Sequence, residues 1–334
     1  MTTQALPVTG STGIRTWLRD MWHFNWPLTL SVLLCMALVP FYLVAAIVDP
    51  RIITGAPAFV KPLKFVLSFG IYLTTFLWLL SLVQGKRRLV ATIAVVTGMG
   101  ALAEIALITL QAARGVTSHY NHSTPLDATL INIMAMIIVL VAFANLGLGI
   151  LLLFQRLPNR ATAWAIRLGV LITFIGMMIG FLMTSSPSPA QHAKMAAGEE
   201  PTIFGAHSVG VEDGGPGLPF MGWSTEGGDL RVAHFFGLHA MQALPLLALA
   251  LTLSAVRRRT RPGQRTAVVL IGGLAYLGWI ILLTWQALRS QPVLALDMLT
   301  GSAYALLLGI TAAALLITLW PRSTSTSTVA ETLG

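Results

Sequence analysis

The side chains best suited to chemistry in this sequence are its seven histidines. Neutral imidazole tolerates apolar surroundings, titrates near neutral pH and ligates haem iron or transition metals. Except for His23, all of them fall on one side of the membrane spans predicted below: His119, His122, His192, His207, His234 and His239. We therefore expect a functional site on that side.

His239 is the strongest single candidate for an axial haem ligand or a buried proton carrier. It lies about two turns inside the apolar run that starts near residue 232. His234 is five residues away, which rotates the two side chains by about 140° on a regular helix, so they cannot ligate one metal from the same face. A hydrogen bond to a neighbouring helix is the structural alternative for His239. Pro245 is expected to kink this helix.

His119 and His122 are three residues apart and, with His239, are candidate metal ligands. The surrounding segment 118–127 is rich in Asn, Ser, Thr and Pro, which favours a turn. Thr124 or Asp127 is then expected to cap the helix that follows. Exposed or capping roles for the two histidines are the alternative.

Glu104 is a candidate catalytic residue, like His239. It shares a helical stripe with Gln111 and Arg114 and lies about 15 Å below Arg114, near the middle of a span. A carboxyl group there must be protonated or paired with a base such as Lys64. It can act as a proton relay or ligand site, or it can form an interhelical hydrogen bond.

Four further charged residues are candidates for binding a cofactor together with His234 and His239. Arg114 and Arg289 end their helices on the histidine side, where the helix dipole alone explains a cation. Alternatively, they face one another and bind a haem propionate, a phosphate or a carboxylate. Asp229 and Arg231 enter the membrane beside His234.

The elements that position these residues are membrane helices. The chain has 334 residues, of which 55% are hydrophobic and 10% charged, and its mean hydropathy is +0.77, which excludes a soluble globular protein. Each of eight apolar runs is long enough to cross a bilayer as a helix. The runs are 27–48, 62–84, 89–112, 127–154, 163–184, 232–255, 267–288 and 298–320.

The positive charges indicate orientation. If both termini are cytoplasmic, 14 of the 21 Lys and Arg residues lie inside, as the positive-inside rule requires. The net charge of +9 therefore does not indicate a nucleic-acid partner. We expect a plasma (inner) membrane protein of bacterial type. Its one cysteine, Cys35, excludes intrachain disulfides and Cys-rich metal sites.

The expected organisation has four parts. Residues 1–26 form a cytoplasmic segment with an interfacial helix carrying Trp17 and Trp22. Residues 27–154 and 155–320 form two four-helix halves, the second including an extracytoplasmic loop at 185–230 whose Gly, Pro and large apolar residues favour a folded cap. The tail, 321–334, is expected to be disordered.

The halves carry a sequence repeat. Residues 98–114 align with 273–289 at 8 of 17 positions, including a shared Thr-x-Gln-Ala-x-Arg motif at the same end of two spans. Four spans separate the two segments, so the halves are expected to be parallel repeats related by an axis along the membrane normal.

Eight spans in two groups of four, with outward histidines, are similar in outline to the haem A synthase family. That resemblance implies haem held at the outer side of two four-helix halves. It covers topology alone, since the second, fourth and eighth spans here contain no histidine and no residue role can be carried over.

The sequence thus predicts an all-α, polytopic membrane protein with an outward-facing pocket that binds haem or a transition metal for redox or sensing chemistry. P-loop, Rossmann, HExxH and GxSxG motifs are absent. Two other functions stay open. One is proton-coupled transport of a small anionic solute, and the other is an accessory or assembly subunit. A homo-oligomer or a partner membrane protein is compatible with each.

Overall fold

The computed structural model describes residues 13–157 and 159–320. In this part of the chain, seven helices are long and apolar enough to cross a membrane, and a bent pair makes an eighth span if it is counted as one. The predicted tail and residues 1–12 of the predicted N-terminal segment lie outside it. The spans are α1 (Ile14–Val48), α2 (Val60–Ser81), α3 (Arg87–Arg114), α4 (Pro125–Leu153), α5 (Arg160–Thr184), the pair α7 (Leu230–Leu238) and α8 (Ala240–Ala250), α10 (Pro262–Leu288) and α11 (Met298–Leu319).

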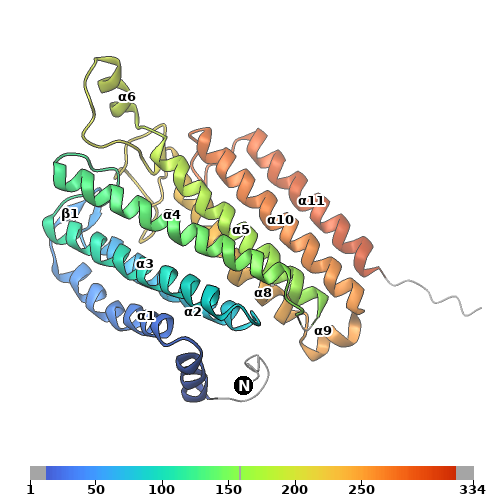
Figure 1. The fold of residues 1–334 in the computed structure, drawn as a ribbon. Coiled ribbons are helices and arrows are strands. Elements are labelled where there is room, and N and C mark those ends of the chain that lie inside the picture. Colours follow the sequence, from blue (N-terminus) through green and yellow to red (C-terminus); the bar gives the residue numbers. More distant parts are fainter. Residues whose placement is uncertain (1–12, 158, 321–334) are drawn as a thin grey trace, which may run out of the picture.

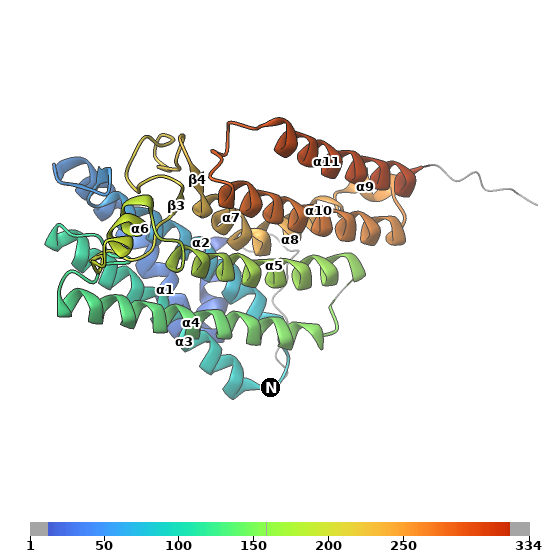
Figure 2. The same cartoon turned by 90° about the horizontal axis from the view of Figure 1, so that it is seen from above.

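The helices pack in two successive groups. In the first, α1 packs against α2 and α3, α2 against α3, and α3 against α4. In the second, α5 packs against the bent pair and α10, the bent pair against α10, and α10 against α11. The groups meet where α4 packs against α5, and α11 lies at the edge beside α10 (Figures 1 and 2). The chain is therefore a mostly helical, multi-pass membrane protein.

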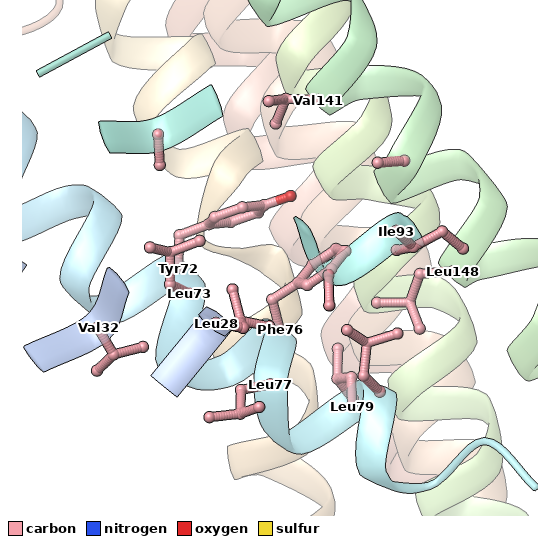
Figure 3. Close-up of a cluster of buried hydrophobic side chains, with 14 of the residues drawn as sticks. Leu28, Val32, Tyr72, Leu73, Phe76, Leu77, Leu79, Ile93, Val141 and Leu148 are labelled. Carbon is pink, nitrogen blue, oxygen red and sulfur yellow. The ribbon is translucent and has the colours of Figure 1, made fainter. Parts of the chain in front are cut away.

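The core of the first group is apolar. Leucines of α1 and α2 meet Ile93 of α3 and Val141 and Leu148 of α4 around the ring of Phe76, which is fully buried (Figure 3). The one polar atom at its edge, the Tyr72 hydroxyl group, donates to Asn145 Oδ1 over 3.4 Å.

α1 is two helices joined at Asn25, whose backbone angles (φ −156°, ψ 87°) are not helical. The Asn25 side chain accepts a hydrogen bond from Leu28 N and so caps the second piece. Trp22 and Trp26 beside the break are exposed. The first piece is a separate short helix before the first span, and its predicted place at the membrane interface stays a prediction (Figure 1).

The sixth span bends by 48° between α7 and α8. The break falls at His239, which ends one helix and begins the next. Pro245, where a kink or loosening was expected, lies six residues after this bend and inside α8.

Neighbouring helices satisfy the backbone groups that the bend exposes. The hydroxyl group of Thr173 in α5 donates to Leu238 O over 3.2 Å and accepts from Met241 N over 3.1 Å. From α10, the Tyr276 hydroxyl group donates to Phe236 O over 2.6 Å. Irregular backbone at membrane depth requires such protein partners, because lipid offers none.

A close helix contact holds the bend against α5. A Cβ atom added to Gly176 would lie 2.6 Å from the carbonyl carbon of Gly237. Only glycine on both helices allows this approach, which brings the Thr173 hydroxyl group within reach of the bend.

Residues 185–229 form a folded segment at one end of the bundle, called the cap below (Figure 1). It contains α6 (Pro189–Ala196) and strands β3 (Ser208–Val209) and β4 (Gly228–Asp229), which pair in antiparallel fashion. A second hairpin, β1 (Ile52–Ile53) with β2 (Ala56–Pro57), touches the cap through Gly55 and Gly214. The short helix α9 (Ser254–Arg259) lies at the opposite end of the bundle.

The glycine contact is testable. We expect Gly176→Val to separate α5 from α7, cost roughly 1–3 kcal/mol through overpacking and lower the thermal unfolding midpoint of detergent-purified protein. Gly309→Ala is the matched control, since that α11 glycine has no neighbour within 4 Å and alanine favours a helix. Equal midpoints for the two variants would contradict the proposed role of the contact.

Candidate functional site

Under the cap, Lys61 of α2 meets His119 of the loop between α3 and α4. Lys61 Nζ lies 3.1 Å from His119 Nδ1, and Ser118 Oγ lies 2.9 Å from the same nitrogen. A lysine ammonium group only donates, so Nδ1 is the acceptor and the ring carries its proton on Nε2. His119 is thereby a hydrogen-bond donor toward the space beyond it.

His207 of the cap is fixed by Asp213. His207 Nδ1 lies 2.6 Å from Asp213 Oδ2, and the same carboxylate accepts from the backbone N–H groups of His207 and Ser208. A carboxylate accepts only, so His207 Nδ1 carries the proton and Nε2 keeps its lone pair.

The pKa values of these loop groups follow from burial and hydrogen bonding. Burial lowers the pKa of His207, and Asp213 offsets only part of that effect. Burial also lowers the pKa of His119 well below 6.5, and the neighbouring Lys61 adds to the shift. For Asp213, burial opposes ionisation, but the hydrogen bonds from His207 outweigh it and lower the pKa. Both histidines are therefore neutral at neutral pH.

His234 of α7 is held against α5. Its Nδ1 lies 2.7 Å from Gly176 O, and the ring packs over Gly180, where a Cβ atom would lie 3.2 Å from Cε1. A carbonyl oxygen only accepts, so here too Nδ1 carries the proton and Nε2 is free to accept or ligate.

Seven residues that lie near one another are together called the chamber below, and four of them, His119, Tyr120, His207 and Asp213, line a pocket; the other three are Lys61, Arg231 and His234. The Tyr120 ring stands between the two loop histidines, with centroids 6.0 Å from that of His119 and 5.1 Å from that of His207. His119, His207 and His234 lie within range of one another's charge, as do Lys61, Asp213 and Arg231.

A half-open pocket of about 340 Å³ leads from the cap surface to His119, Tyr120, His207 and Asp213. Its other walls come from the cap and adjoining loops and mix polar with apolar surface: Thr54, Thr117, Ser188, Ala190, Gln191, Lys194, Pro201, Thr202, Ile203, Gly205, Ala206 and Glu212.

Asp229 and Arg231 bind each other and the cap beside the chamber. Asp229 is buried and accepts from Arg231 Nη2 over 2.5 Å and from Ser224 N over 2.8 Å. Arg231 also donates to Gly222 O, and Lys64 of α2 donates to Met221 O. The second half of the cap is thereby tied to one helix of each group.

Arg114 and Arg289 are each paired locally. Arg114 Nη1 lies 2.6 Å from Asp127 Oδ1, near the start of α4, and Arg289 Nη2 lies 2.6 Å from Asp297 Oδ2, the N-cap of α11. The hydrogen bonds to Arg289 lower the pKa of Asp297. The expected anion site between the two arginines is not formed, because each guanidinium group already holds a carboxylate.

Each arginine–aspartate pair also lies at the N-terminal cap of the following helix. Thr124 accepts from Asp127 N, as the sequence predicted, and Asp297 accepts from Thr300 N. Gln111 donates to Asp127 in the first group, and Arg114 donates to Gln111. The Gln and Arg of the shared motif therefore tie one helix to the next in both groups, because Gln286 of α10 accepts from the Tyr304 hydroxyl group of α11 over 2.9 Å.

The structure does not gather the three predicted metal ligands. His122 is exposed, whereas His239 packs against Phe235 with ring centroids 4.4 Å apart and lies close to Gln242. Across residues 13–157 and 159–320, no group of three or more His, Cys, Asp or Glu side chains could hold a metal ion.

Glu104 is fully buried in α3 and has no hydrogen-bond partner at either carboxyl oxygen. The suggested partner, Lys64, points instead to the cap. Lys61 is the charged residue whose field reaches Glu104.

Sequence reasoning missed the importance of Lys61, Tyr120, His207 and Asp213. His207 and Asp213 are six residues apart in a Gly-rich loop with no periodicity, so no local pattern signals their contact. Lys61 reaches His119 across 58 positions of sequence. In both cases the contact forms only in the folded structure, so no local sequence pattern reveals it.

The histidine pKa shifts predict that the cap loosens in acid. The ordinary pKa of histidine is 6.5. Below that pH, histidines in the unfolded loops bind protons that the buried His119 and His207 rings do not bind, so the folded cap becomes less stable as the pH decreases. Asp213 acts in the same direction only below 3.8. Amide hydrogen exchange in residues 200–213, corrected for its intrinsic pH dependence, should be faster at about pH 5.5 than at about pH 7.5.

The double variant His119→Asn with His207→Asn should lose most of that difference, while His122→Asn, at an exposed position, should keep it. Equal exchange of the wild-type cap at both pH values would show that these rings do not control it.

The chain was compared with family models, curated proteins and solved structures, and none of them matches.

Proposed function

We propose that the chamber binds haem for redox or sensing chemistry, with His234 as the axial ligand fixed to the helix bundle and His207 as the second axial ligand, from the cap. The observation that carries this proposal is the hydrogen bonding of the His207 and His234 rings. Each donates its Nδ1 proton to a fixed acceptor and keeps a free Nε2 lone pair. Such an outer partner orients a ligating imidazole and raises its basicity.

Haem suits this chamber better than a bare metal ion does. A protein-bound ion such as zinc takes three or four protein ligands, and the described residues form no such group. Haem iron already has four ring nitrogens and needs one or two protein ligands. A transition metal ion bound by fewer ligands is the weaker form of the same proposal.

The surroundings also favour an anionic group with a flat apolar body. Lys61 and Lys64 bring positive charge to the chamber, which favours carboxylates such as haem propionates, whereas Arg231 is already paired with Asp229. An aromatic ring adjoins the same space, that of Phe65 beside His119. His119 can donate from Nε2 to a bound group.

We further infer that the two groups of helices are parallel repeats. The same pairwise packing recurs in α1–α4 and in α5–α11, and the shared Gln and Arg residues occupy equivalent helix ends. The ends opposite the cap carry the basic clusters 86–88 and 257–259. They support cytoplasmic termini in a bacterial-type inner membrane, with the cap outside.

A second candidate is binding of a small polar solute in the cap pocket. The pocket of about 340 Å³ with hydroxyl, amide and charged walls favours it. Transport of that solute is less favoured, because the apolar core around Phe76 fills the first helix group (Figure 3).

Haem titration of the detergent-purified protein tests the proposal. We expect a Soret band that saturates at one haem per chain and the absorption of low-spin, bis-histidine iron. His234→Ala should weaken binding by at least about tenfold, because the bundle-fixed ligand is lost. His207→Ala should retain haem but convert it to a high-spin form.

His23→Ala, at the opposite end of the chain's spans, is the control and should behave as wild type. Unsaturable binding, or equal spectra for the two chamber variants and the control, would overturn the proposal. Saturable binding of a polar solute without a Soret band would favour the second candidate.

A further inference from the structure

The deepest unexplained group in the bundle is the Glu104 carboxyl. It is fully buried, and both oxygens lack a hydrogen-bond partner in the described part of the chain. It lies ten residues from the cap end of α3, about 15 Å along the helix axis. A buried polar group without a partner costs free energy, so a purely structural role does not explain it.

The helices packed against α3 leave Glu104 a single charged neighbour. Between residues 27 and 48, α1 has no charged side chain, and α4 has only Asp127, which Arg114 already holds. From α2, Lys61 and Glu104 each lie within range of the other's charge. Lys64, the other cation of α2, is committed to the cap.

Lys61 also touches the chamber. Its ammonium group donates to His119 Nδ1 over 3.1 Å, and its field reaches Asp213. A lysine carries its charge on a flexible four-carbon stem with three protons to donate. Lys61 thus connects the buried carboxyl with His119, which lines the pocket.

The repeat indicates that the fold does not require an acid at this position. Residue 104 aligns with Trp279 of the second group. That side chain packs among aromatic rings, with centroids 4.5 Å from that of Phe236 and 5.5 Å from that of Tyr276. The same place in the architecture is therefore filled by an apolar side chain.

We propose that Glu104 is a proton-exchanging site connected to the chamber through Lys61 and His119. Inward, the flexible Lys61 side chain turns toward Glu104, the carboxylate takes a proton from its ammonium group, and the resulting amine takes a proton from a hydronium ion in the pocket water. Outward, the protonated carboxyl returns its proton to the Lys61 amine, the ammonium group gives a proton to His119 Nδ1, and the ring releases its Nε2 proton to the pocket water. No electron moves and no other bond breaks.

Infrared difference spectroscopy of the full chain in detergent, without added haem, tests this. The carboxylic-acid C=O stretch of buried Glu104 should rise and fall with pH and should vanish in Glu104→Gln. It should persist in Glu200→Gln, whose residue is exposed on the cap. Lys61→Met should move the midpoint of the band to higher pH, because the carboxylate loses its nearest cation.

The route is tested separately by transfer into D₂O, which shifts the same band as the proton is replaced. Lys61→Met and His119→Phe both retain Glu104 and should slow that shift by at least about tenfold, the scale of a lost proton-transfer partner. A wild-type band that does not respond to pH would overturn the exchange site. Unchanged shift rates in both variants would overturn the route. Neither outcome depends on whether haem binds.

Discussion

The structure depends on one constraint: inside a membrane bundle, every backbone or side-chain polar group needs a protein partner, because lipid offers none. The bent span obeys it, since Thr173 and Tyr276 take up the groups freed around His239. The helix ends obey it through Arg114 and Arg289, each paired with an aspartate of the next helix. In the described residues, buried oxygens of Thr97, Glu104 and Gln242 have no hydrogen-bond partner, and Glu104 is the ionisable residue among them.

The cap brings together the polar groups at one end of the helix bundle. Lys64 from the first helix group and Arg231 from the second donate hydrogen bonds to the cap. The cap residue His207 packs against Tyr120. A single folded segment thus joins the two groups of helices and completes a chamber that neither forms alone.

Much of the fold could be predicted from the sequence, because the length of an apolar run and the charges at its ends are local properties. The eight runs are of this kind, and so is the cap of the fourth span, which the sequence assigned to Thr124 or Asp127. The bend at His239 could not be predicted in position, since Thr173 and Tyr276, which stabilise it, are distant in sequence. The site was predicted as a region, but the partners of its residues were not. Arg114 and Arg289 belong to the repeated motif, yet each forms an ion pair with a nearby aspartate. His207 gains its role from a contact within a loop, where the sequence shows no helix or strand periodicity.

The central claim is that two imidazoles with anchored Nδ1 atoms present their Nε2 atoms to one bound group beneath the cap. An experimental density map of the haem-saturated protein tests it most directly. The account predicts iron density bonded to Nε2 of His234 and of His207, with the propionates near Lys61 or Lys64. Haem density outside the chamber, or rings whose Nε2 atoms face lipid or bulk water, would contradict it.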